Sequence, residues 1–330
     1  MCLVHSILQM ARHESKLADK QRQRRGISLY EAGYRPATLH RYRSALFAFA
    51  RWWESQDVVE LLDDSVEEFD VSVSYYLSFL WEAGHGRSRA ATLLSGIVLY
   101  LPRLRGKLAV CTRLLKNWSK AEPSVPYPPM TRDVAAAVAI HLAADGKPDS
   151  GVAVLLGFAG FLRISEIVGL CCSDVADAKD TRTNMSSMVL RLASTKTGTE
   201  QSVVIRDEQV QRLVRYHLRS RPARGPLFSF SAAQFRSAFK QTCVKLGLSS
   251  SFTPHSLRHG AATHAFLSGM PVESIMSMGR WKQSTSAAHY IQSGRALLLK
   301  MVIPDNVSEL GVEVWQDVVG CFERVRSAKQ

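Results

Sequence analysis

The chain has 330 residues, of which 46% are apolar and 22% are charged. This length and apolar content suffice for two globular domains with ordinary cores, and they exclude a disordered chain. Lysine and arginine outnumber aspartate and glutamate by 42 to 29. The resulting net charge of +13 favours a polyanionic partner, because each phosphate that a protein neutralises releases counterions.

The cysteine and hydropathy patterns exclude further classes of protein. The six cysteines form no C-x-x-C pair, and Cys171 and Cys172 are adjacent, so neither a zinc knuckle nor a disulfide framework is expected. No stretch approaches the roughly 18 consecutive apolar residues of a membrane span, and residues 1–16 lack the cleavage site of a signal peptide. We therefore expect an intracellular protein with reduced thiols and no membrane partner.

The first 120 residues are predicted to form a basic arm and a helical domain. The arm, residues 1–30, contains KQRQRR, which is a nuclear import signal, an arm that contacts nucleic acid, or a solvated charge run. Over residues 31–120, apolar residues at helical spacing after Pro36 indicate amphipathic helices. Between residues 71 and 120, eight lysines and arginines face a single acid. DNA contacts are therefore expected from Arg87, Arg89, Arg103, Arg105 and Lys107.

A proline-rich linker is predicted at residues 121–131, where four prolines in eleven residues prevent a helix. At its end, Thr131 is placed to cap the next helix. The apolar run GVAVLLGFAGFL then predicts a buried helix that ends near Arg163. This segment opens a second domain, expected at residues 132–302.

The rest of the second domain is predicted to contain one hairpin and several helices. MVLRLAS at 188–194 and QSVVIR at 201–206 have the composition of strands, and Gly198 is expected in the turn between them. Helices are predicted at 207–220, 231–246, 254–268 and 284–292. The fold class is therefore mainly α with a small antiparallel β-sheet.

Residues 303–330 form a C-terminal tail with the apolar spacing of an amphipathic helix. The spaced residues are Leu310, Val314, Trp315, Val318, Phe322 and Val325. The simplest expectation from this spacing is that the helix packs on its own domain.

Two short motifs contain candidate anion-binding residues. Arg163 and Glu166 are three residues apart in LRISE, and His255 and Arg258 are three apart in HSLR, so each pair lies on one helix face. An arginine at the end of an apolar helix suits bidentate binding of a phosphate. An ion pair with Glu166 is the structural alternative for Arg163, and it is compatible with a role in orienting the guanidinium.

A tryptophan and a tyrosine follow at fixed intervals. Trp281 lies 23 residues after Arg258, and Tyr290 lies nine residues after Trp281. Either residue alone is most simply a core side chain, but two nearby arginines would favour the phenolate of a tyrosine, whose pKa is ordinarily about 10. His255 and His259 have the spacing of a zinc pair, yet Ser256 replaces the glutamate of H-E-x-x-H, so no metal site is expected.

The set of two arginines, a histidine, a tryptophan and a late tyrosine resembles the tyrosine recombinase (phage integrase) family, with GRWK similar to a branch from eukaryotic mobile elements. The resemblance implies that Arg163 and Arg258 clamp the scissile phosphate, that His255 handles a proton, and that Tyr290 attacks to form a 3′-phosphotyrosyl link. It also implies a general-acid lysine, either Lys196 in the hairpin or, as second choice, Lys179 in the polar loop that precedes the predicted strand.

The resemblance carries further expectations about the whole protein. Trp281 stands where many family members have histidine, and its indole N–H is expected to donate to a phosphate oxygen. The two domains are expected to form a C-shaped clamp on double-stranded DNA, without cofactor, as a dimer to tetramer in the nucleus or the nucleoid. The resemblance also implies a second alternative for residues 303–330, in which the tail docks into an apolar groove of a neighbouring protomer. In that case, deletion of residues 306–330 is expected to spare DNA binding and to impair assembly. The implied function is site-specific recombination of a DNA element, and the alternatives are a type IB topoisomerase or a catalytically silent DNA-binding protein.

Overall fold

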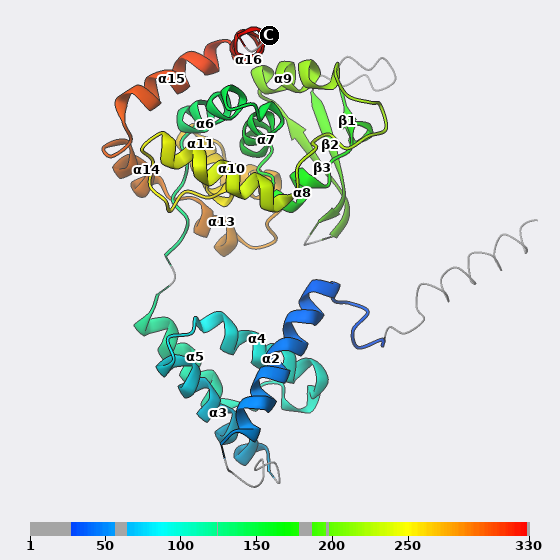
Figure 1. Ribbon diagram of the computed structural model, residues 1–330, viewed down its shortest axis with the longest axis vertical. Coiled ribbons are helices and arrows are strands. Elements are labelled where there is room, and N and C mark those ends of the chain that lie inside the picture. Colours follow the sequence, from blue (N-terminus) through cyan, green and yellow to red (C-terminus); the bar gives the residue numbers. More distant parts are fainter. Residues whose placement is uncertain (1–27, 57–64, 124, 178–186, 196–197, 329–330) are drawn as a thin grey trace, which may run out of the picture. The chain divides into compact units, whose positions relative to one another are not determined.

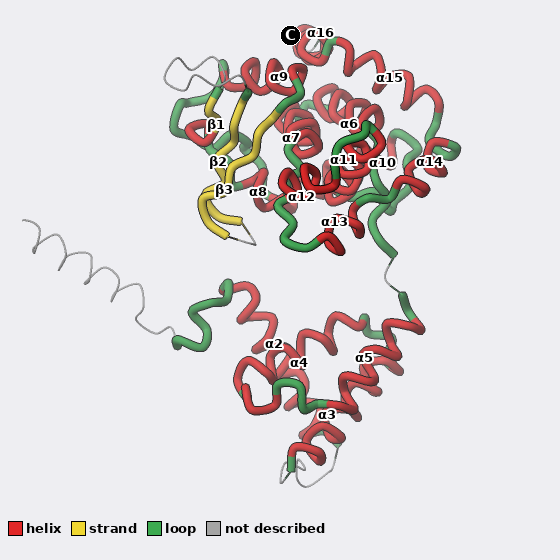
Figure 2. The backbone as a smooth tube through the Cα atoms, turned by 180° about the vertical axis from the view of Figure 1, so that it is seen from behind, coloured by secondary structure: helices red, strands yellow, loops and turns green. Residues whose placement is uncertain are grey.

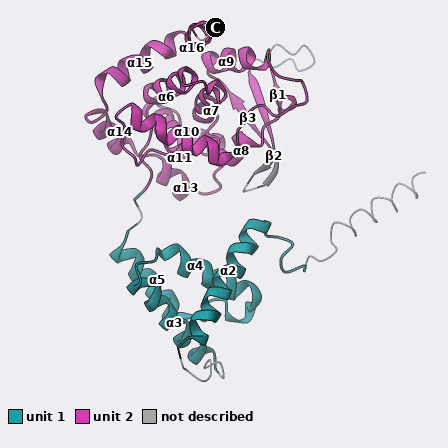
Figure 3. Cartoon of the chain, in the orientation of Figure 1, with its two compact units in different colours: residues 1–125 teal, residues 126–330 magenta. Residues whose placement is uncertain are grey.

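The computed structural model describes residues 28–56, 65–123, 125–177, 187–195 and 198–328. The chain divides into two compact units, Met1–Val125 and Pro126–Gln330 (Figure 3), and the division falls inside the proline-rich segment. The structure confirms the predicted fold class, since the chain is mainly helical with one small antiparallel sheet. None of the helices within the described ranges is both long and apolar enough to cross a bilayer.

In the described part of the first unit, four α-helices and one short 3-10 helix pack around an apolar core. The α-helices are α2 (Pro36–Glu54), α3 (Val66–Glu82), α4 (Arg87–Tyr100) and α5 (Ala109–Ala121). Pro36 occupies the first turn of α2, and the Ser65 hydroxyl caps α3 by accepting from the backbone N–H of Glu68. The buried carboxylate of Asp70 accepts from the first backbone N–H groups of α5, at 2.7 and 3.0 Å, and so fixes α3 against α5.

The second unit is built around two buried helices, α6 (Arg132–Ala144) and α7 (Pro148–Ala159), which pack on each other (Figure 1). The Thr131 hydroxyl caps α6, as predicted. The end of the predicted linker belongs to this unit, because residues 128–130 are buried and the Met130 N–H donates to the Ser256 carbonyl at 3.0 Å.

The sheet of the second unit has the order β1 (Val175–Ala176), β2 (Met188–Thr195) and β3 (Gly198–Ile205), with both pairings antiparallel (Figure 2). The predicted hairpin is therefore present, and the short β1 is an addition to it. Gly198 was expected in the turn, but it pairs with Thr195 as the first residue of β3, because the ladder continues further than the strand composition indicated.

The predicted helices of the second unit are α9 (Glu208–Leu218), α10 (Ala232–Lys245), α11 (Pro254–Leu267) and α13 (Ser284–Tyr290). Three helices that the sequence did not predict are α8 (Ile164–Val168), α12 (Val272–Gly279) and α14 (Ser293–Lys300). The prediction that the apolar helix ends near Arg163 was wrong by one turn. Helix α7 stops at Ala159 because Phe161 adopts a left-handed conformation with a φ of 50°, and Arg163 becomes the N-cap of α8.

The C-terminal tail forms two helices, α15 (Asp305–Gln316) and α16 (Val318–Ser327), where one was predicted. The break is at Asp317, whose carboxylate caps α16 by accepting from the Gly320 N–H at 3.1 Å. Helix α15 packs on α6 of the same unit so closely that a Cβ at Gly311 would collide with the backbone of Asp133. In the single chain the tail therefore packs on its own unit, which is the first of the two alternatives.

Candidate active site

Arg163 is positioned by Glu166 at the start of α8. The Arg163 backbone N–H donates to one Glu166 carboxylate oxygen at 2.8 Å, and its guanidinium donates to the other at 2.7 Å. The Glu166 side chain is 1% exposed and that of Arg163 is 17% exposed. The predicted ion pair therefore exists, and it leaves part of the Arg163 side chain exposed.

Arg258 lies on α11, and its side chain is fully buried. The two terminal nitrogens donate to backbone carbonyls, one to Phe161 and the other to Gly279. Its guanidinium also lies 4.7 Å from the ring centroid of Trp281 and 5.4 Å from that of Tyr290. Arg258 thus joins three segments that are distant in sequence, and the two aromatic rings cover it.

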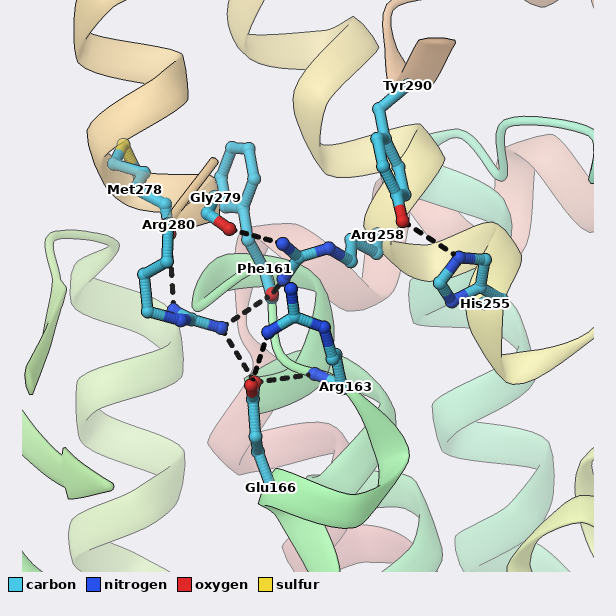
Figure 4. A network of polar contacts seen from close by, with 9 residues as sticks. All are labelled: Phe161, Arg163, Glu166, His255, Arg258, Met278, Gly279, Arg280 and Tyr290. Atoms are coloured by element: carbon cyan, nitrogen blue, oxygen red, sulfur yellow. Dashed lines mark hydrogen bonds and ion pairs between the residues drawn. The ribbon is translucent and has the colours of Figure 1, made fainter. Parts of the chain in front are cut away.

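Arg280 is a third arginine in this cluster, and sequence analysis did not identify it. Its guanidinium donates to Glu166 at 2.6 Å and to the Phe161 carbonyl at 3.2 Å. Figure 4 shows the guanidinium groups of Arg163, Arg258 and Arg280 converging between Phe161 and Glu166. The run GRWK was the only sequence signal, and it did not indicate which way the arginine points.

The electrostatics of the cluster favour an anion. The cluster contains three guanidinium groups and one carboxylate: Arg163 and Arg280 donate to Glu166, whereas Arg258 donates to backbone carbonyls, so positive charge is in excess. Burial, followed by repulsion from Arg163 and Arg280, lowers the pKa of Arg258, and burial also lowers the pKa of Arg280. Because an arginine stays charged in a protein, these lowered pKa values represent unfavourable energy that a bound phosphate would relieve.

Tyr290 is the last residue of α13, and its hydroxyl lies 3.2 Å from Nε2 of His255 (Figure 4). His255 is held in the first turn of α11, which Thr253 caps and Pro254 begins. The Tyr290 carbonyl accepts from the hydroxyl of Thr263 at 3.2 Å, which ties the end of α13 to α11. The phenol is therefore fixed beside a base and next to the arginine cluster.

The Tyr290 ring lies between two other rings. Its centroid is 4.6 Å from that of Trp281 and 4.4 Å from that of His259, with interplanar angles of 29° and 31°. The indole packs directly over Gly279, where a Cβ would overlap the ring. Among the described residues the indole Nε1 has no hydrogen-bond partner, and the atom is buried. In this arrangement Trp281 supports the Tyr290 ring, and donation from its indole N–H to a phosphate oxygen stays a prediction.

His259 is a buried histidine in the core of the site, as the sequence favoured. Its Nδ1 lies 2.8 Å from the Gln292 side-chain nitrogen, which donates to it. Burial, followed by the nearby His255 and His289, lowers the pKa of His259 to about 3. His259 is therefore neutral at physiological pH, and it adds no charge beside the phenol.

Some predicted residues lie outside the described part of the chain, and others belong to the first unit. Lys196, Lys179 and the run at residues 20–25 are outside the described residues. The five basic residues predicted to bind DNA in the first unit are exposed: Arg87, Arg89, Arg103, Arg105 and Lys107. They lie at opposite ends of α4, which is about 20 Å long at 1.5 Å per residue, so they form two groups and not one patch.

Comparison with known proteins identifies the class of protein that has this site. Residues 132–296, half of the chain, match the model of the phage integrase family, so the chain belongs to that family. It is a site-specific DNA recombinase of the tyrosine recombinase type, which confirms the family and the kind of enzyme predicted from the sequence. A topoisomerase and a silent DNA-binding protein are not favoured.

Individual proteins resemble the chain over most of its length. Tyrosine recombinase XerD of Corynebacterium glutamicum is 27% identical over 276 residues, which span 75% of this chain and 84% of that protein. The Tn1549 transposon integrase, in complex with circular intermediate DNA, has a TM-score of 0.58 at 15% identity over 86% of this chain and 97% of its own. A lambda integrase dimer bound to a COC′ core site has a TM-score of 0.56 at 18% identity, over 88% and 95%. The two solved structures share the fold of the chain.

Proposed function

We propose that Tyr290 is the nucleophile of DNA cleavage and that Arg163 and Arg258 bind the scissile phosphate. The observation that carries this proposal is the contact of the Tyr290 hydroxyl with His255 at 3.2 Å, beside a cluster with excess positive charge. A phenol, a base and fixed cations are the groups that a phosphoryl transfer needs, because that reaction depends mainly on alignment and on neutralising charge.

The proposed reaction conserves the number of phosphodiester bonds. The Tyr290 oxygen bonds to phosphorus while the bond from phosphorus to the 5′ oxygen breaks, which gives a 3′-phosphotyrosyl link and a free 5′ hydroxyl. His255 accepts the phenolic proton at Nε2 when its own proton is on Nδ1. A 5′ hydroxyl from a partner strand then reverses the step, so no ATP is consumed.

The leaving 5′ oxygen needs a proton, and we assign its donor to a lysine in the β2–β3 hairpin. Lys196 follows Thr195, the last residue of β2, and Lys179, which precedes β2 in the sequence and lies outside the hairpin, is the second choice. An ammonium group placed at the leaving oxygen is a suitable general acid. No metal and no cofactor are included in the proposal, because the two arginines provide the charge that a metal ion would otherwise supply.

Contact of Arg258 with a phosphate requires the site to open. Its guanidinium is fully buried beside the rings of Trp281 and Tyr290, whereas the side chain of Arg163 is partly exposed. We propose that DNA first binds at Arg163 and that movement of the Tyr290 ring toward the phosphorus then uncovers Arg258. Tyr290 would thus reach the phosphorus and Arg258 would become accessible to the phosphate in the same step.

A cavity beside the site suggests the path of one DNA strand. The cavity has a volume of about 580 Å³, and its lining includes His255, Tyr127, Arg236 and Lys240. Arg236 and Lys240 are one turn apart on α10, both are exposed, and neither forms an ion pair with another described residue. A positive wall with an aromatic ring is suited to a nucleic-acid backbone and a base. We propose that the strand enters the site along this wall.

We propose that double-stranded DNA is held by both units and that two to four copies act together on it. The exposed basic groups at the two ends of α4 and the net charge of +13 support the first part. Dimer formation by lambda integrase on a core site supports the second. In this arrangement residues 31–120 and 132–302 both contact the DNA, residues 1–30 provide a basic arm, and residues 303–330 remain packed on the second unit as in the single chain.

The biological event that we propose is integration, excision or transposition of a DNA element, in whichever compartment contains that DNA. The test is incubation with a suicide DNA substrate whose 5′ product is lost after cleavage. A covalent protein–DNA adduct that survives denaturation, and that Tyr290→Phe abolishes, supports the proposal. A purely reversible mobility shift with the wild-type protein would overturn it.

A further inference from the structure

Arg280 has an unusual backbone conformation. It follows the last residue of α12 with φ 55° and ψ 43°, in the left-handed region that favours glycine. Arg280 and Phe161 are the two non-glycine residues with positive φ among the described residues. The Arg280 guanidinium donates to the Phe161 carbonyl at 3.2 Å, so the two strained positions are in direct contact. Strain retained at two contacting positions in one site points to a role for that contact.

The need to end helix α12 does not explain why residue 280 is an arginine. Glycine adopts the left-handed conformation without steric conflict, and it needs no buried cation. The Arg280 side chain, in contrast, is 7% exposed and places a guanidinium in the interior of the unit. The side chain must therefore make contacts that offset both the backbone strain and the loss of hydration.

The contacts of Arg280 connect the groups that hold the two other arginines. Glu166, which orients Arg163, accepts from Arg280 at 2.6 Å through the oxygen that also accepts the Arg163 backbone N–H. The Phe161 carbonyl, which accepts from Arg280, also accepts from Arg258. Displacement of Arg280 would therefore remove a contact from Glu166, which holds Arg163, and a contact from the Phe161 carbonyl, which holds Arg258.

The charge of Arg280 matters as much as its geometry. Without it, the Glu166 carboxylate would be balanced by Arg163 alone, and much of the field of that cation would be cancelled before a phosphate arrived. With it, one arginine neutralises Glu166, and the charges of Arg163 and Arg258 remain available to the phosphate.

We propose that Arg280 is a positioning residue that neutralises Glu166 and aligns Arg163 with Arg258 for phosphate binding, without itself touching the phosphate. This inference rests on the proposed cleavage by Tyr290. It predicts that loss of the Arg280 side chain slows cleavage, and that removing the charge of Glu166 as well restores part of the rate.

The test compares Arg280→Gly, Glu166→Gln and the double variant in single-turnover adduct formation with the suicide substrate. Glycine suits the left-handed backbone, so the variant removes the side chain without adding strain. We expect Arg280→Gly to cleave roughly 10- to 100-fold more slowly, with DNA affinity unchanged to within about 2-fold. The double variant should cleave faster than Arg280→Gly. Arg326→Ala removes one positive charge from an exposed position in α16 and should cleave at the wild-type rate.

Arg280→Lys keeps the proposal falsifiable if the glycine variant unfolds. A lysine retains the charge beside Glu166 but lacks the fork that reaches both Glu166 and the Phe161 carbonyl, so an intermediate rate is expected. Wild-type cleavage by Arg280→Gly, or a double variant whose loss is the product of the two single losses, would overturn the inference and leave the proposed function intact. Failure of the wild-type protein to form an adduct would overturn the proposed function itself.

Discussion

Replacement of Trp281 by alanine tests whether the indole positions the Tyr290 ring. The indole is 8% exposed, lies 4.6 Å from the Tyr290 centroid and covers the Arg258 guanidinium. Truncation of a buried tryptophan costs about 3–5 kcal/mol, which for a unit of this size lowers the melting temperature by roughly 6–20 °C. Because Tyr290 loses one of its two flanking rings, cleavage should also fall about 100-fold.

Trp281→Phe is the matched control for this prediction, since it retains a ring against Tyr290 and the Arg258 guanidinium. Thermal unfolding gives the stability of each variant, and single-turnover adduct formation well below the melting temperature gives the rate. The phenylalanine variant should lose less on both measures. If Trp281→Ala cleaves at the wild-type rate while folded, stacking on the indole does not position the nucleophile.

Three further predictions concern the clamp, the pH dependence and the tail. Arg163→Ala and Arg258→Ala should each reduce the rate of cleavage by about 100-fold or more, with a smaller loss of DNA affinity. If both variants cleave at the wild-type rate, the two arginines do not bind the scissile phosphate. Addition of EDTA should leave the wild-type rate unchanged. The pKa of His259 is lowered to about 3 in the folded protein, so between pH 6.5 and 3 the unfolded chain binds a proton there and the folded protein does not. The free energy of unfolding should therefore fall by about 1.4 kcal/mol per pH unit as pH drops from about 6.5 toward 3. In urea titrations, His259→Gln should flatten that slope. Burial also lowers the pKa of His217 and of His264, so part of the pH dependence of stability should remain in the His259→Gln variant. Deletion of residues 306–330 should lower the melting temperature, because Trp315 and neighbouring tail residues belong to the core of the second unit, and an unchanged melting temperature would contradict this packing.

The sequence predicted the fold class and the members of the site better than it predicted their contacts. Apolar spacing and capping residues placed α6, α9, α10, α11 and α13 near their observed bounds, because each helix begins at a local signal such as Thr131 or Pro254. The end of α7 was misplaced because a left-handed phenylalanine has no signature in sequence.

Arg280 was missed for a related physical reason. It lies 114 residues from Glu166, and its contact depends on a left-handed turn that only the folded chain shows. Trp281 was predicted to belong to the site, but its support of Tyr290 depends on packing over Gly279 and Arg258, which spacing does not reveal. Local pattern thus identified five residues that the fold brings together, and tertiary packing decided what each one contacts: Arg163, His255, Arg258, Trp281 and Tyr290.

The central claim is that Tyr290 becomes covalently attached to DNA, and peptide mapping of the adduct tests it most directly. The wild-type protein is trapped on the suicide substrate, digested and analysed by mass spectrometry, with Tyr290→Phe treated in parallel. We predict that the nucleotide remnant lies on Tyr290 at the 3′ phosphate and that the variant binds DNA with nearly unchanged affinity but forms no adduct. A remnant on any other residue, or an adduct with the phenylalanine variant, would contradict the account.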